Sequence, residues 1–172
     1  DLTGAARMLE VGGNTGVMAE ALLAAYPGLE AVVMDLPAVC AMGVARAGGV
    51  PGLSFVAADA RAVDWRDAAG PVDTVLLKSV LHDWPEAEAV GMLDRAVAAV
   101  PPGGRVIVAE RGSMAAEAGQ GLQDSVAAHL LFSLLFLDPA FYSFHLLNII
   151  MKRKRCVDFC FIPIHELSSI FS

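Results

Sequence analysis

Five short apolar runs alternate with helical segments along the first 110 residues, and this alternation constrains the fold more than any other feature. The runs are Arg7–Val11, Ala31–Met34, Leu53–Ala57, Asp73–Leu77 and Arg105–Ala109. They are almost continuously apolar, which is typical of strands buried on both faces of a parallel sheet. The segments with a helical pattern between them are Val17–Tyr26, Pro37–Ala47 and Pro85–Val100. This order predicts an α/β fold with a doubly wound, mostly parallel sheet and a ligand at the carboxyl ends of its strands.

Composition limits the kind of protein this is. A chain of 172 residues with 56% hydrophobic and 18% charged residues is expected to form one domain with a substantial core. The net charge of −7 argues against a nucleic-acid partner. Cys156 and Cys160 stand close together with only His165 nearby, so we expect buried thiols and no metal site. No signal-peptide pattern opens the sequence, and we expect a cytoplasmic protein.

The last third of the chain has a different character. We assign residues 1–124 to the core and residues 125–172 to an atypical, apolar, helical C-terminal segment that completes the same domain. Asp138-Pro139 divides Ser125–Met151 into two uncharged runs of 13 residues, each too short to span a membrane. We therefore expect buried or partner-facing helices, which are compatible with a homodimer. Val157–Ile164 is a candidate late strand.

A glycine-rich stretch, Glu10-Val-Gly-Gly-Asn-Thr-Gly16, follows the first apolar run. It lacks the spacing of a dinucleotide loop, because Asn14 and Val17 occupy two of the glycine positions, and it lacks the lysine of a Walker loop. An acid before a glycine turn suits a ligand whose bound group is not a pyrophosphate. Glu10 is expected to meet a cationic or amino group, directly or through water. The alternative is a purely structural turn.

Two further acids stand at the ends of the second and third runs. Asp35 has two acceptor oxygens that match the vicinal hydroxyls of a ribose, unless it only caps the helix that begins at Leu36-Pro37. Asp59 is placed to accept a hydrogen bond from an adenine amino group, unless it is an ordinary turn aspartate. Together with Glu10, these acids are predicted to converge on one crevice.

The fourth and fifth runs end in groups suited to proton transfer. Lys78 stands at the end of the fourth, and His82 and Asp83 precede the next helix. An imidazole can accept a proton near neutral pH. Glu110 ends the fifth run, about 5 Å away in a parallel sheet, where it could orient the His82 ring. The alternative is a histidine that starts a helix and does no catalytic work.

These motifs together resemble the S-adenosylmethionine-dependent small-molecule O-methyltransferases of the caffeic acid, hydroxyindole and polyketide-tailoring type. The resemblance extends over about residues 7–111. It is carried by Glu10–Gly16, Tyr26-Pro27, Met34-Asp-Leu-Pro37, Leu77-Lys78, Leu81-His-Asp-Trp84, Pro102-Gly-Gly104 and Val106–Glu110. Among these, the Asp-Leu-Pro and Leu-His-Asp-Trp strings are the specific ones.

The resemblance implies a Rossmann-like class I methyltransferase core and a role for each matching residue. The loop would hold the methionine part of S-adenosylmethionine, Asp35 the ribose and Asp59 the adenine edge. His82 would be the general base, with Asp83 beside the substrate and Glu110 bracketing the ring. The full set expected at the cofactor is Glu10, Gly12, Gly13, Gly16, Asp35, Leu36, Asp59, Ala60 and Lys78.

The sequence also departs from the family pattern. Asn14 stands at the commonest central glycine of the loop, so the backbone there must tolerate a side chain. Ala60-Arg61 replaces the methionine or phenylalanine that often covers the adenine. The second bracketing acid and the N-terminal helical dimerisation domain have no counterpart, so we expect a fragment or truncated form.

We predict methyl transfer to a hydroxyl of a small aromatic or polyketide-like substrate. The alternatives are a catalytically impaired module that binds the cofactor or a partner, and a relative that uses the bound cofactor for hydroxylation or decarboxylation.

Overall fold

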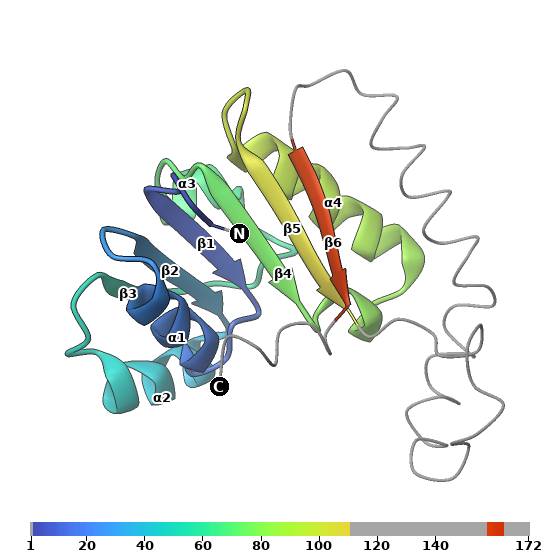
Figure 1. Cartoon of the computed structure of the whole chain (residues 1–172). Coiled ribbons are helices and arrows are strands. Elements are labelled where there is room, and N and C mark those ends of the chain that lie inside the picture. Colours follow the sequence, from blue (N-terminus) through green and yellow to red (C-terminus); the bar gives the residue numbers. More distant parts are fainter. Residues whose placement is uncertain (1, 111–157, 164–172) are drawn as a thin grey trace, which may run out of the picture.

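The structure, a computed structural model, describes residues 2–110 and 158–163, and these form one parallel sheet with helices on both faces (Figure 1). The strand order is β3-β2-β1-β4-β5-β6, and every adjacent pair is parallel. The strands are β1 (Arg7–Val11), β2 (Glu30–Asp35), β3 (Leu53–Ala57), β4 (Thr74–Lys78), β5 (Arg105–Glu110) and β6 (Asp158–Pro163). This confirms the predicted doubly wound fold. The order reverses between β1 and β4, which is where ligands bind in such sheets.

Helices cover the sheet in two layers, each with its own hydrophobic core. The helices are α1 (Val17–Ala25), α2 (Pro37–Ala47), α3 (Trp65–Ala69), the 3₁₀ turn η1 (Leu81–Asp83) and α4 (Glu86–Ala99). One core packs α1 and α2 against the sheet, and the other packs α3 and α4 (Figure 1). Successive residues of β1 enter opposite cores, Met8 the first and Leu9 the second, as strand geometry requires. Glu10, two residues after Met8, is therefore on the α1 side.

Two short elements were not predicted. The helix α3 has a single turn, yet the sequence does carry its signals. The Asp64 carboxylate accepts hydrogen bonds from the backbone N–H groups of Arg66 and Asp67, and Gly70 follows the last residue with a φ of 77°. The turn η1 carries His82 and occupies only three residues. Elements this short leave no hydrophobic periodicity to detect.

The candidate late strand at Val157–Ile164 is confirmed as β6, which pairs with β5 from Arg105–Asp158 to Glu110–Pro163. The predicted loop and apolar helices of residues 112–151, and the boundary at residue 124, lie outside the described residues. Within the described part of the chain, every helix is too short or too polar to span a bilayer.

Candidate active site

The glycine loop leaves β1 and turns sharply, with three residues at positive φ. These are Gly12 at 68°, Asn14 at 53° and Gly16 at 80°. Gly12 also has no room for a side chain, because a Cβ there would lie 2.8 Å from Cγ2 of Val80. Asparagine is one of the few other residues that adopt positive φ readily. The prediction that the backbone at Asn14 tolerates a side chain is therefore confirmed.

The Asp35 carboxylate joins this loop to the end of β2. Its Oδ2 accepts a hydrogen bond from the Asn14 backbone N–H at 2.8 Å, and its Oδ1 accepts one from the Leu36 N–H at 2.8 Å. Asp35 does not cap α2, because the N-cap is Leu36 and no side chain caps that helix. Each oxygen keeps a further lone pair for another donor. Asp35 is thus fixed beside the loop with acceptor capacity to spare.

Glu10 lies beneath the loop. It is 3% exposed, and no described residue donates a hydrogen bond to its Oε2. A Cβ at Gly13 would lie 2.8 Å from its Cδ, so Gly13 covers the carboxyl group closely. Burial raises the pKa of Glu10 to about 7, while the Lys78 charge and the Ala19 backbone N–H act in the opposite direction. The sequence correctly predicted an acid at the loop, but it did not predict that this acid is buried.

Arg46 of α2 anchors the loop from the side. Its Nε and Nη2 donate to the carbonyl oxygen of Thr15 at 3.1 and 3.0 Å, and its Nη1 lies 2.7 Å from Oε2 of Glu20 in α1. The guanidinium therefore connects α2, α1 and the loop. Sequence reasoning missed this residue, because Arg46 and Thr15 are 31 positions apart and no local pattern relates them.

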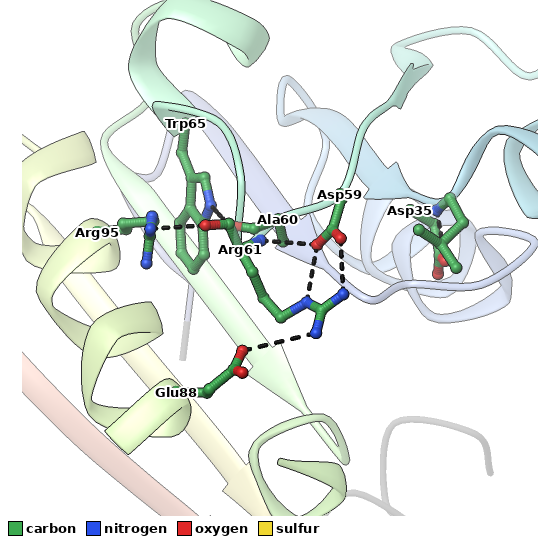
Figure 2. Close-up of polar contacts among 8 residues, drawn as sticks. Asp35, Asp59, Ala60, Arg61, Trp65, Glu88 and Arg95 are labelled. Carbon is green, nitrogen blue, oxygen red and sulfur yellow. Dashed lines mark hydrogen bonds and ion pairs between the residues drawn. The ribbon is translucent and has the colours of Figure 1, made fainter. Parts of the chain in front are cut away.

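Asp59 is held by a neighbour (Figure 2). Its Oδ1 accepts from Nε of Arg61 at 3.0 Å and from the Arg61 backbone N–H at 2.9 Å, and its Oδ2 accepts from Nη2 at 2.7 Å. These hydrogen bonds lower the pKa of Asp59 to about 2. The Ala60 carbonyl accepts from Nε1 of the buried Trp65 at 2.7 Å. These contacts are those of an aspartate that stabilises its own turn, which was the alternative interpretation of Asp59. An adenine amino group would compete with Arg61 for the Asp59 carboxylate.

Lys78 ends β4, and His82 follows this strand in η1. Nε2 of His82 lies 3.4 Å from Oδ1 of Asp83, and the His82 side chain is 28% exposed. Lys78 is the last residue of β4, and it is opposite Ala109 of β5. Glu110 is the next residue of β5, but its side chain lies outside the described structure. The predicted bracketing of His82 by Glu110 therefore stays a prediction.

Comparison with known proteins identifies the family. The O-methyltransferase domain family matches residues 1–136. Trans-resveratrol di-O-methyltransferase of Vitis vinifera is 35% identical over 133 residues, which cover 76% of this chain and 34% of that protein.

Two solved structures are similar as well. The mitomycin 7-O-methyltransferase MmcR superimposes with a TM-score of 0.63 at 26% identity, covering 78% of this chain and 38% of that one. The O-methyltransferase NcsB1, in complex with S-adenosylmethionine and 2-hydroxy-5-methyl naphthoic acid, gives a TM-score of 0.55 at 28% identity, with coverages of 63% and 33%.

The chain spans about a third of the length of these curated relatives. The match nevertheless extends over more than half of this sequence, and it includes the glycine loop, the ends of β2 and β3 and the turn η1. On this evidence the chain belongs to the O-methyltransferase domain family.

Proposed function

We propose that this chain supplies the cofactor-binding and catalytic part of an S-adenosylmethionine-dependent O-methyltransferase acting on a hydroxyl of a small aromatic substrate. The observation that carries the proposal is the 2.8 Å hydrogen bond from the Asn14 N–H to Asp35, which joins the glycine loop to the acid at the end of β2. The relatives support the substrate class, because one methylates resveratrol by name and another was solved with a naphthoic acid.

The residues present fit S-adenosylmethionine at two of three places. The spare acceptor capacity of Asp35 suits the two hydroxyls of a ribose. The loop approaches a ligand through backbone, and Oε2 of Glu10, which accepts no hydrogen bond from the described residues, suits an amino group reached through water. Asp59 offers an adenine amino group only the one lone pair that Arg61 leaves free, unless the guanidinium gives up a hydrogen bond.

The chain's own residues would then remove the proton of the substrate hydroxyl. S-adenosylmethionine, when bound, supplies an electrophilic methyl group on a sulfonium. A phenol of pKa about 10 is a poor nucleophile while protonated, so His82 takes its proton as the oxygen meets the methyl group. Asp83, 3.4 Å from Nε2, stabilises the positive charge that the ring acquires. Lys78 and the loop position the reacting groups in line.

The test has two stages. Isothermal titration with S-adenosylmethionine and S-adenosylhomocysteine asks whether the site binds; folded protein that binds neither would reject the proposal. A methyl-transfer assay with stilbene, flavonoid and naphthoate phenols then asks whether the chain turns over. Binding without turnover would favour the second candidate, a cofactor-binding module. The pairing of Asp59 with Arg61 engages a group predicted for the cofactor, which fits an impaired site better than a fully active one.

Asp35→Asn should weaken binding of S-adenosylhomocysteine by about tenfold or more, because a charged acceptor is lost and the amide N–H₂ would face either the Asn14 or the Leu36 N–H donor. Isothermal titration measures the change. Asp64→Asn, the same substitution at the N-cap of α3, controls for the loss of one negative charge. Equal affinities in Asp35→Asn and the parent chain would reject the ribose role.

Arg46→Ala should raise the Kd for S-adenosylhomocysteine by roughly two- to tenfold, because the carbonyl of Thr15 loses two donors and the loop loses its tie to α2. The maximal rate at saturating cofactor should change little, since the side chain of Arg46 contacts Thr15 of the loop and Glu20 of α1 and not the proposed base. Arg46→Lys keeps the charge near Glu20 but not the fork, so it should restore only part of the affinity. A lower kcat with unchanged Kd would contradict this role.

A further inference from the structure

Arg61, in the turn after β3, lies between two acids and an aromatic ring. Its guanidinium forms a bidentate pair with Asp59, and its Nη1 lies 3.6 Å from Oε2 of Glu88 in α4 (Figure 2). Its Cζ lies 4.0 Å from the centre of the Trp84 ring. One cation thus connects the acid after β3, the first half of α4 and the residue that follows His82 and Asp83.

The acceptor capacity of Asp59 is nearly used up by this one residue. A carboxylate can accept about four hydrogen bonds. Arg61 donates three, from Nε, from Nη2 and from its backbone N–H. The low pKa of Asp59 agrees with an anion already stabilised by these donors. A second donor group that approaches Asp59 finds one lone pair left, on Oδ2, and must otherwise displace the guanidinium.

The Arg61 guanidinium has a second acid within reach, so it can exchange one ion pair for another. Glu88 is an alternative anion on the other side of Arg61, and the face of the Trp84 ring supports a cation in either position. The main chain of Arg61 stays anchored, because its carbonyl accepts from Nη2 of Arg95 at 2.6 Å. The side chains of Asp59 and Arg61 are 36% and 37% exposed, so exchanging one ion pair for the other changes the free energy little.

We propose that Arg61 competes with the adenine amino group of the S-adenosyl ligand for Asp59, and that its shift toward Glu88 sets the affinity of the site. This inference rests on the proposed function. Arg61 is then an affinity-determining residue that touches the cofactor site only through Asp59. The two acids have opposite effects, because Asp59 is the group to be released and Glu88 is the group that receives the cation.

Opposite effects give a sharp test in the full chain, by isothermal titration with S-adenosylhomocysteine. Arg61→Gln frees Asp59 and should lower the Kd by about two- to fivefold. Glu88→Gln leaves the guanidinium with Asp59 alone and should raise the Kd by a similar factor. Arg66→Gln, which removes the same charge from an exposed position of α3, should leave the Kd unchanged. In an Asp59→Asn background the gain from Arg61→Gln should vanish.

A ligand without the adenine amino group adds a second readout. Arg61→Gln should not improve binding of the inosine analogue of S-adenosylhomocysteine. Weaker or unchanged binding of S-adenosylhomocysteine by Arg61→Gln, or a shift in the same direction in Glu88→Gln, would overturn the competition. If neither the parent nor Arg61→Gln binds while both stay folded, the proposed function itself fails.

Discussion

Replacing His82 by alanine is expected to lower kcat for methyl transfer by about 10²- to 10⁴-fold, the usual contribution of a positioned general base. The Kd for S-adenosylhomocysteine should change little, because His82 is assigned to the substrate hydroxyl and is not among the groups proposed to hold the cofactor. Single-turnover methylation measures the chemical step, and isothermal titration measures the affinity. Parent-like turnover in His82→Ala would show that the base is another group.

Acidity of the substrate gives this prediction an internal control. A phenol of low pKa is already ionised in solution and needs no base, whereas one with a pKa near 10 does. The defect of His82→Ala should therefore shrink along a series of substrates of falling pKa. Asp83→Asn should cost less than His82→Ala, because it removes only the charge 3.4 Å from Nε2 and leaves the ring in place. A defect that is constant along the series would assign His82 a structural role.

Replacing Glu10 by glutamine should change how stability depends on pH. Burial raises the pKa of Glu10 from 4.5 to about 7, so the folded state holds a proton that the unfolded chain has already released. Below pH 4.5 both states are protonated and the favourable contribution is fully present. It is lost as the pH rises toward 7, and above this pH the folded state carries the whole penalty of a buried charge, about 3 kcal/mol.

The glutamine variant lacks this penalty. Its free energy of unfolding minus that of the parent should therefore grow between pH 4.5 and 7 by up to about 3 kcal/mol and then level off. Urea denaturation across this range measures the difference, and other titrating groups cancel in it. Asp67→Asn, at an exposed position of α3, shows what the loss of one negative charge does by itself. A difference independent of pH would mean that folding does not raise the pKa of Glu10.

The central strands were predictable because burial on both faces leaves a clear mark in sequence. The bounds of β1 and β3 match the apolar runs at Arg7–Val11 and Leu53–Ala57, and β4 differs from its run by one residue at each end. The position of the site followed from these strands, since a parallel sheet places Asp35 and Lys78 at one end. The residues of the loop were identifiable because glycines at positive φ have no substitutes except residues such as Asn14.

The partners of the side chains were not predictable in the same way. Whether Glu10 is open or covered depends on Gly13 and on the Ala19 N–H, and these meet it only in the folded turn. The capture of Asp59 by Arg61 depends on the backbone angles between them. The sequence shows that two opposite charges stand two residues apart, but it does not show that they form a bidentate ion pair. Contacts such as Arg46 with Thr15 arise only after α2 has packed beside α1.

The register of β5 with β6 bears on how the molecule comes to be folded. Five neighbouring strands come from the first 110 residues, whereas their sixth partner begins at Asp158, so this pairing closes the longest chain loop in the described sheet. Closing a long loop is entropically costly and is rewarded only after the rest of the sheet exists. During synthesis, β5 must therefore present unpaired backbone groups until residues 158–163 have left the ribosome.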